Sequence, residues 1–348
     1  MFTGNTEVIL PKLKLGGLIL DKALNEKIKV INDYLRTKEK KKISNSKLRK
    51  LIEDNVGEFK CPTRDIKVDK YTKEGILGVD GSISNVGATF PYVLTLIRAY
   101  TMNTKSDKHG NMEKVEEVFC PVYEEDRLTL EDMVAEVDGS TTMENAFQRY
   151  TKDRMAELEL MSAMQGIERF NSKMILMDGG FYRFEITCPS LWKKFKALCL
   201  KTGTLAVGVI EEVSTHKLSK LLREELPPNM NKDYDRELLF GALKAGEWLK
   251  INEDIEIKKG YYTSFARFSK HPQVIGIDFL KEQMDEVDTT MDLIASLTPI
   301  NSRGVPIWVD MVDANVRITQ KETDVLLSSM DIDIREKFIM ANHDRRQY

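Results

Sequence analysis

The sequence predicts a mixed α/β protein in which a sheet is flanked by helices and preceded by a helical N-terminal extension. Two β-prone segments share one form, an apolar run that ends in aspartate and then glycine: residues 75–82 contain Asp80, and residues 173–182 contain Asp178. A long helical pattern separates them, and further β-prone segments follow. Because short apolar runs of this kind are typical of strands buried in a sheet, these observations favour helices packed on a mixed sheet.

The first 70 residues are predicted to form the helical extension. Apolar residues recur at helical spacing over residues 18–36, which indicates an amphipathic helix. A basic run at residues 38–42 ends this pattern, and Ser44 or Ser46 is placed to cap a second helix. The basic run is a candidate DNA contact, although charge runs more commonly form a solvated face.

Residues 71–348 are predicted to form one composite domain, because they contain no internal repeat, low-complexity tract or clear linker. Strands are expected where apolar, β-branched and aromatic residues cluster between turn formers, and helices where apolar residues recur every three or four positions. The expected elements are strands at residues 76–79, 88–100 and 118–123 around a polar loop or hairpin tip at 103–117, a helix at 141–170, a strand at 173–178, a helix at 191–201, a strand at 204–213, a helix at 214–225, a hairpin of strands at 261–268 and 273–279, a strand at 306–309, and helices at 319–329 and from residue 334.

Composition excludes several classes of protein. The 348 residues are 42% hydrophobic and 31% charged, which indicates a soluble globular protein. No apolar run approaches the roughly 18 residues of a membrane span, and no signal-peptide pattern opens the chain, so we expect a cytoplasmic protein without a membrane partner. Four scattered cysteines form no Cys-x-x-Cys pair, which indicates neither a zinc ribbon nor a disulfide framework. The net charge of −3 gives no bulk attraction for a polyanion, so nucleic-acid contacts require local basic groups or metal.

Asp80 and Asp178 are the candidate metal ligands. Ligands bind at the C-terminal edge of strands in open α/β sheets, and the glycine after each aspartate lets a ligand come close. Hydrolysis of a phosphodiester by two metal ions needs carboxylates that hold the ions roughly 3.5–4 Å apart, and Mn²⁺ and Mg²⁺ prefer oxygen ligands. The competing interpretation is that aspartate before glycine only forms a turn.

The helix expected at residues 141–170 leads directly into the second aspartate strand. It contains no proline, and Arg154, Glu157 and Glu159 lie closest to a face of small residues that can approach a sheet. Glu159 or Glu157 is therefore a candidate third ligand, although helix glutamates are usually solvated. His343 is a candidate general acid or phosphate contact, whereas exposed chain ends of this kind more often have no such role.

Several short segments occur in one order that is similar to a known family. They are Gly-Val-Asp-Gly-Ser at 78–82, the helix with Glu157 and Glu159, Ile-Leu-Met-Asp-Gly at 175–179, Val-Gly-Val-Ile at 207–210, Gln-Val-Ile-Gly-Ile-Asp at 273–278, Gly-Val-Pro-Ile-Trp-Val-Asp-Met-Val-Asp-Ala-Asn at 304–315, and a late His343. By their order and spacing, from about residue 75 to the C-terminus, the chain resembles the NurA nucleases.

The resemblance implies an RNase H-like fold and a homodimeric nuclease that cleaves DNA as an exonuclease and single-strand endonuclease. It implies a HerA-type hexameric ATPase as partner, in DNA end processing or defence. It also implies that Asp80, Asp178 and a helix glutamate hold Mn²⁺ or Mg²⁺. Glu159 is favoured over Glu157 because it faces the small residues, and His343 corresponds to a C-terminal histidine of the family.

One position departs from the family pattern. After the strand at 207–210 the family usually has a lysine, whereas this chain has Glu211 and Glu212, and Lys217 is a candidate substitute one helical turn further on. The departure keeps open a second hypothesis, a non-catalytic dimeric adaptor that gates the access of DNA to the ATPase ring. A third hypothesis, an actin-like or sugar-kinase-like ATPase, is disfavoured because no second phosphate loop or adenosine pocket motif is present.

Overall fold

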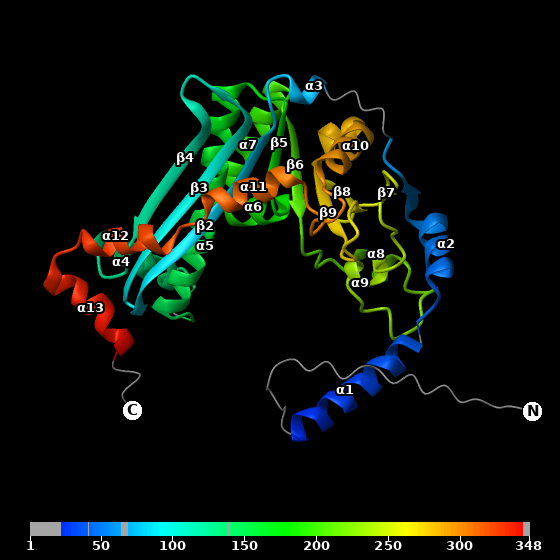
Figure 1. Ribbon diagram of the computed structural model, residues 1–348, viewed down its shortest axis with the longest axis horizontal. Coiled ribbons are helices and arrows are strands. Elements are labelled where there is room, and N and C mark those ends of the chain that lie inside the picture. The colour runs from blue at the N-terminus through cyan, green and yellow to red at the C-terminus, as the bar shows by residue number, and fades with distance from the viewer. Residues whose placement is uncertain (1–21, 41, 64–68, 138–139, 344–348) are drawn as a thin grey trace, which may run out of the picture.

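A computed structural model describes residues 22–40, 42–63, 69–137 and 140–343, which are organised around one mixed sheet (Figure 1). The strands are β1 (Gly57–Lys60), β2 (Leu77–Thr89), β3 (Tyr92–Asp107), β4 (Gly110–Phe119), β5 (Met174–Asp178), β6 (Leu205–Ile210), β7 (Glu247–Ile251), β8 (Tyr261–Arg267) and β9 (Ile275–Leu280). The helices are α1 (Lys22–Lys40), α2 (Asn45–Asn55), α3 (Asp69–Thr72), α4 (Glu124–Ala135), α5 (Met143–Phe170), α6 (Phe181–Thr187), α7 (Pro189–Thr202), α8 (Lys217–Leu221), α9 (Asp235–Leu239), α10 (Val287–Leu297), α11 (Ile307–Val316), α12 (Gln320–Ser328) and α13 (Ile332–His343), with a 3-10 helix η1 (Lys281–Glu286).

The sheet has the strand order β1-β7-β8-β9-β6-β5-β2-β3-β4. Strands β2, β3 and β4 form an antiparallel meander, and β5 and β6 continue from the other edge of β2 in parallel. Strand β9 then pairs antiparallel with β6 and leads to β8, β7 and β1. This arrangement confirms the expected fold class, an RNase H-like mixed sheet flanked by helices.

Helices cover both faces of the half of the sheet that contains β2 and β5. On one face, α5, α6 and α7 bury apolar residues of β2, β5 and β6, with Trp192 and Phe195 among the largest. On the other face α11 lies across β2 and β3 (Figure 1), where Trp308 and Val312 pack with Tyr100. Gly78 permits this close packing, because a β-carbon there would lie 2.7 Å from Val312 Cγ2.

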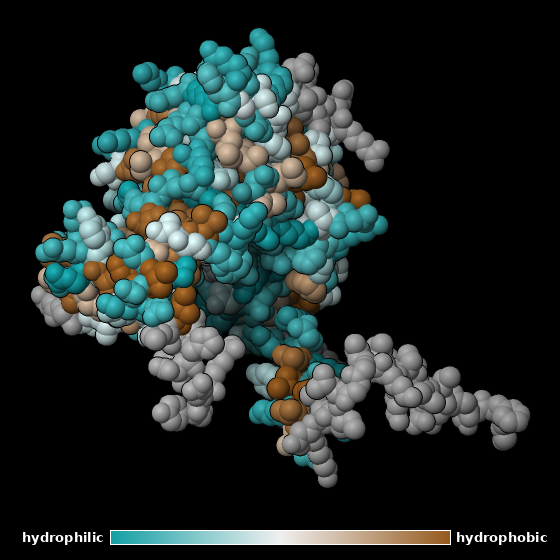
Figure 2. Space-filling model, turned by 60° about the vertical axis from the view of Figure 1, so that its left-hand side comes forward, coloured by the Kyte–Doolittle hydropathy of each residue, from teal (hydrophilic) through white to brown (hydrophobic). Residues whose placement is uncertain are grey.

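The segment before residue 70 contributes to the body of the protein. Leu48 and Ile52 of α2 are buried in the core of the β6–β9 half, and β1 pairs with β7 at the edge of the sheet. The described part of this segment is therefore not helical throughout. Helix α1 extends away from the sheet and exposes its apolar side chains (Figures 1 and 2). The domain boundary near residue 70 stays a prediction.

Several expected elements are confirmed and some are wrong. Ser44 caps α2, and α5 and the β8–β9 hairpin follow the predicted pattern. The strand expected at residues 306–309 is instead the start of α11, because Pro306 occupies the N-cap position of a helix. The segment 103–117 is mostly strand, because β3 and β4 pair as a long hairpin whose second strand, β4, lies at the edge of the sheet and tolerates polar side chains. Within the described residues, no helix is both long and apolar enough to cross a bilayer.

Candidate active site

The pairing of β2 with β5 places Asp80 beside Asp178. Leu77, Gly78 and Val79 pair in parallel register with Ile175, Leu176 and Met177. The next residue along each strand is an aspartate. The two strands are about 4.8 Å apart, so the two aspartates are neighbours and their carboxylates point to the same side of the sheet. Strand β5 ends at Asp178 while β2 continues. The two carboxylates therefore lie side by side at the C-terminal edge of β5.

Glu159 reaches the same edge from α5, on the face of the sheet that this helix covers. Its side chain is almost fully buried, at 1% exposure. It approaches β2 at Gly81, where a β-carbon would lie 2.6 Å from Glu159 Oε1. The Gly81 amide meanwhile donates a 2.7 Å hydrogen bond to Asp80 Oδ1. The glycine after the first aspartate is thus what brings the helix carboxylate near Asp80.

Glu157 lies on a different face of α5 from Glu159. Two residues of α-helix correspond to a rotation of about 200°, and Glu157 forms a 2.5 Å ion pair with Arg154. Arg154 in turn binds Glu117 of β4 at 2.6 Å. Of the two predicted glutamates, Glu159 is the one that lies with Asp80 and Asp178.

Asp313 of α11 belongs to this acidic group, although no role was predicted for it. Its charge helps to raise the pKa of both Asp80 and Asp178, and its carboxylate forms a 2.5 Å ion pair with Arg317. The residue lies in the segment 304–315 that matched the family pattern. The resemblance was the one sequence feature that pointed to this segment. A strand expected at 306–309, in place of helix α11, did not predict that Asp313 lies near the other carboxylates.

The acidic group holds protons unusually tightly. The pKa of Asp80 is raised to about 8, first by burial and then by the charges of Asp178 and Glu159. Burial and Asp178 raise the pKa of Glu159 to about 7, although the positive charge of Arg183 opposes the shift. Burial also raises the pKa of Asp178, against the effects of Arg183 and Arg303. Because repulsion between carboxylates contributes to the shifts, a bound cation would relieve it.

The donors suit a hard divalent cation. Mn²⁺ and Mg²⁺ are bound through oxygen, and Asp80, Asp178, Glu159 and Asp313 offer only carboxylate oxygens. Glu159 Oε1 is buried and has no hydrogen-bond partner among the described residues. Within the same residues, no three histidine, cysteine, aspartate or glutamate side chains are already arranged as a metal-binding group. The chemistry of the donors fits the expected cations, while their present spacing does not form a closed cage.

A buried ion pair fixes the turn that follows Asp178. Asp278 of β9 is fully buried, and its carboxylate accepts hydrogen bonds from the Phe181 amide at 3.1 Å and the Thr263 hydroxyl at 2.7 Å. Lys258 Nζ lies 2.8 Å from the same carboxylate. These bonds hold the N-terminus of α6 next to β5. No role is predicted for Asp278 from the sequence, because its partners come from three segments that are separate along the chain.

The helix that carries His343 packs at the other end of β2. Phe338 of α13 lies in a cluster with Val86 and Leu94, and six residues of strand from Asp80 to Val86 span about 20 Å. His343 is the last residue of α13, and its side chain lies outside the described part of the structure. Its role at the phosphate stays a prediction.

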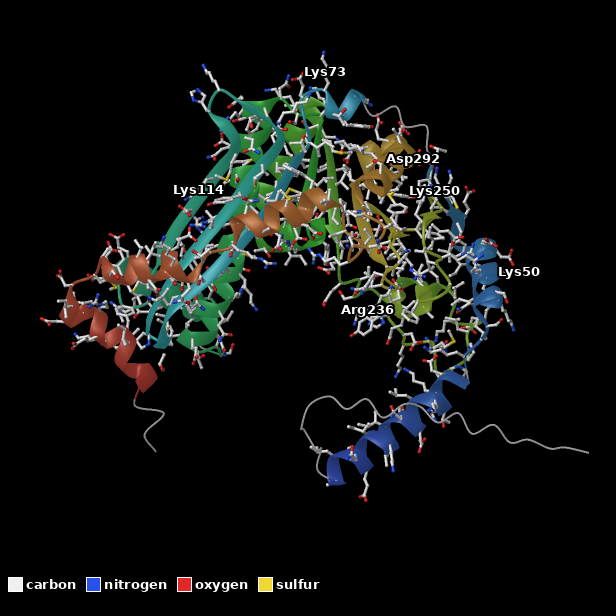
Figure 3. All side chains as sticks on the ribbon, in the orientation of Figure 1. Lys50, Lys73, Lys114, Arg236, Lys250 and Asp292 are labelled. Carbon is white, nitrogen blue, oxygen red and sulfur yellow. The ribbon has the colours of Figure 1, made fainter. Side chains whose placement is uncertain are left out.

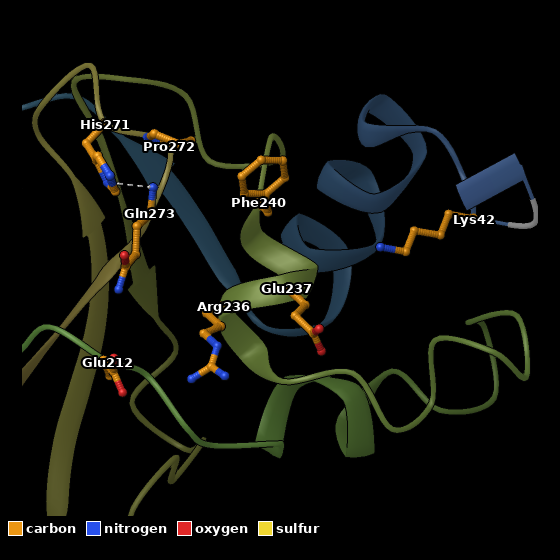
Figure 4. A pocket seen from close by; sticks show the side chains of 8 residues that line it. All are labelled: Lys42, Glu212, Arg236, Glu237, Phe240, His271, Pro272 and Gln273. Atoms are coloured by element: carbon orange, nitrogen blue, oxygen red, sulfur yellow. Dashed lines mark hydrogen bonds between the residues drawn. The ribbon is translucent and has the colours of Figure 1, made fainter. Parts of the chain in front are cut away.

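A separate cavity of about 520 Å³ lies among residues of α9, the loop after β6 and the turn between β8 and β9 (Figure 4). Glu212, Arg236, Phe240 and Gln273 are among its lining residues, and none of the four acidic residues lines it. Among the basic residues, Lys50, Lys114 and Arg236 lie on widely separated elements, α2, β4 and α9 (Figure 3).

Comparison with known proteins gives one family match. The model of the NurA domain matches residues 74–318, well over half of the chain. No curated protein sequence matches at a significant level.

Solved structures give distant matches. One is endonuclease V of Ciona intestinalis in complex with a 23mer DNA that contains an inosine followed by a ribo-adenosine, with 13% identity, a TM-score of 0.37 and coverage of 81% of this chain and 96% of that chain. Endonuclease V of Bacillus subtilis has 13% identity, a TM-score of 0.35 and coverage of 77% and 86%. Argonaute of Aquifex aeolicus has 12% identity, a TM-score of 0.31 and coverage of 74% and 29%.

Proposed function

The chain belongs to the NurA family of nucleases, and we propose that it is a deoxyribonuclease that depends on Mn²⁺ or Mg²⁺ and hydrolyses phosphodiester bonds by a two-metal mechanism. The observation that carries this proposal is the register of β2 and β5, which sets Asp80 beside Asp178. Glu159 supports it, because it approaches the same edge through the space left by Gly81.

Asp80, Asp178 and Glu159 are the proposed ligands, and Asp313 is an additional carboxylate at their side. When bound, divalent cations stabilise charge on the phosphate oxygens and lower the pKa of water. The protein residues hold the cations and exclude water from the helix side, because Glu159 is buried under β2. Protons compete for the carboxylates near neutral pH, since the pKa of Asp80 is about 8 and that of Glu159 about 7.

Arginines next to the carboxylates support a nucleic-acid substrate. Arg303 and Arg317 are exposed, with side-chain exposures of 41% and 70%, and Arg303 also influences the pKa of Asp178. Arg303 forms ion pairs with Glu211 and with Asp310. Glu211, which replaces the family lysine after β6, is thus paired with Arg303, and because Arg303 also acts on the pKa of Asp178 we propose it, in place of Lys217, as the phosphate contact.

Family membership further suggests exonuclease and single-strand endonuclease activity, a homodimer and a HerA-type hexameric ATPase as partner in DNA end processing or defence. The apolar side chains that α1 exposes support a partner of some kind, because isolated helices rarely present such a stripe to water. The exposed side chains include Leu24, Ile28, Ile31 and Leu35.

The test is cleavage of end-labelled single-stranded and double-stranded DNA with Mn²⁺ or Mg²⁺, by the protein alone and with its ATPase. We expect cleavage by the wild type, and loss of cleavage in Asp80→Ala and in EDTA. Absence of cleavage by the wild type under all conditions, or unchanged cleavage by Asp80→Ala, would reject the assignment.

The alternative is a non-catalytic dimeric adaptor that gates the access of DNA to the ATPase ring. It is favoured by one observation, that the described side chains form no ready metal-binding group. Asp178→Ala separates the two functions. The adaptor predicts that the variant still binds the ATPase and retains its biological output in cells, whereas the nuclease predicts retained binding and lost output.

A further inference from the structure

Arg183 lies inside the acidic group. It follows Asp178 by five residues, on the first turn of α6, and its Nη2 donates hydrogen bonds to Glu159 Oε2 and, at 2.8 Å, to the carbonyl oxygen of Asp178. Gly179 leaves room for it, because a β-carbon there would lie 3.1 Å from Arg183 Nε. The guanidinium thus lies over the turn that joins β5 to α6.

The contact between Arg183 and Glu159 uses only part of the hydrogen-bonding capacity of each side chain. Glu159 is 1% exposed, and only one of its oxygens has a partner, since Oε1 is buried without a hydrogen bond. Arg183 Nε is likewise buried without a partner. A buried carboxylate with no counter-charge is strongly destabilising. The guanidinium therefore neutralises Glu159 in the state described, yet it leaves hydrogen-bonding capacity unused on both sides.

The Arg183 side chain is partly exposed to solvent, unlike that of Glu159. The Arg183 side chain is 37% exposed, and its guanidinium packs on the Phe184 ring at 4.4 Å from the ring centre. An arginine in this position is able to leave Glu159 without breaking the core. It differs in this respect from Lys258, which is 16% exposed and bound to the fully buried Asp278.

Resting on the proposed function, we propose that Arg183 is the internal counter-ion of this site: it holds Glu159 when no divalent cation is present and gives it up when one binds. Cation and guanidinium then compete for the same carboxylate oxygens. This explains why the carboxylates, with an arginine among them, form no closed cage of their own. It makes Arg183 a positioning residue that sets how much divalent cation the site requires.

The opposite role would be support, in which Arg183 orients Glu159 for the cation as an outer partner does. The two roles predict opposite changes in cation affinity. Removing a competitor tightens binding, whereas removing a support weakens it.

The experiment is a titration of the metal-free full-length protein with Mn²⁺, without DNA, followed by calorimetry and by the loss of the free Mn²⁺ paramagnetic resonance signal. We expect Arg183→Gln to bind Mn²⁺ on the order of tenfold more tightly, because a charge-assisted hydrogen bond no longer competes. We expect its melting temperature in EDTA to fall. Arg183→Lys keeps the charge but not the planar guanidinium, so we expect a smaller tightening; it also provides the test if Arg183→Gln does not fold without metal.

Arg317→Gln is the matched control, because it removes a positive charge beside Asp313 without a contact to Glu159. The proposal is overturned if both Arg183 variants bind Mn²⁺ with unchanged or weaker affinity, or if Arg317→Gln tightens binding by the same factor. A wild type that binds no Mn²⁺, or binds it equally after Asp80→Asn, would instead overturn the proposed function on which this role rests.

Discussion

The Glu159 carboxylate fills the space next to Gly81 that a side chain at position 81 would need. A β-carbon on Gly81 would lie 2.6 Å from Glu159 Oε1 and 2.7 Å from Met155 Cγ. A strand residue on β2 and a buried carboxylate on α5 are thereby coupled, although they are far apart in the sequence. Even a methyl group added at position 81, next to Asp80, should therefore displace the Glu159 carboxylate.

We therefore expect Gly81→Ala to reduce DNA cleavage on the order of 100-fold, the effect of a misplacement of about 1 Å in an active site. Overpacking should also lower the free energy of unfolding by about 1–3 kcal/mol. The measurements are the cleavage rate at saturating Mn²⁺ and urea unfolding, with Ser84→Ala on the same strand as control. Cleavage at the wild-type rate would show that Glu159 need not lie against β2.

Glu159 and Glu157 provide a matched pair on one helix. We expect Glu159→Gln to lower cleavage more than about 100-fold, since outer partners of metal ligands alone change activity 10- to 100-fold. Glu157→Gln loses a partly exposed ion pair with Arg154, so we expect its cleavage rate within about twofold of the wild type and its unfolding free energy within about 1 kcal/mol. Rates for the two variants that are equal, or reversed in order, would contradict the assignment of Glu159.

Lys258 should matter for stability. Its removal leaves the fully buried Asp278 without its counter-charge, so we expect Lys258→Met to lower the free energy of unfolding by about 3–5 kcal/mol. Lys259→Met, at the exposed neighbouring position, should change it by less than about 0.5 kcal/mol. Chemical unfolding of both variants in EDTA makes the comparison, and equal stabilities would show that the ion pair does not hold the turn after Asp178.

The raised pKa of Asp80 predicts how stability depends on pH. Between its ordinary value of 3.8 and the value of about 8 in the folded protein, the folded state retains a proton that the unfolded chain has released. The free energy of unfolding in EDTA should therefore fall as the pH rises from about 4 to about 8. Asp80→Asn should flatten this dependence and melt at a higher temperature than the wild type at pH 8.

Thermal melts between pH 5 and pH 8.5 test this expectation, with Asp132→Asn on the exposed side of α4 as control. Saturating Mn²⁺ should abolish much of the wild-type slope, because the cation replaces the protons. A melting temperature of Asp80→Asn that tracks the wild type at every pH would contradict the electrostatic account of the site.

The predictable part of this site came from local patterns. Asp80 and Asp178 each follow a short apolar run, and Glu159 lies on a long proline-free helix, so their elements could be inferred without a structure. Asp313 was missed because four apolar residues at 306–309 do not separate a strand from a helix start. Arg183 was missed because its contact with Glu159 depends on how α6 turns back after β5. Strands β1 and β7 were missed because short strands with charged residues owe their conformation to their pairing.

The most direct test of the central claim is a crystal structure of the wild-type protein soaked in Mn²⁺, with anomalous diffraction used to locate the ions. The account predicts anomalous peaks bound by Asp80, Asp178 and Glu159, with Arg183 turned away from Glu159, and no such peaks in Asp80→Asn. Peaks found only elsewhere on the protein, with Arg183 still bound to Glu159, would contradict it.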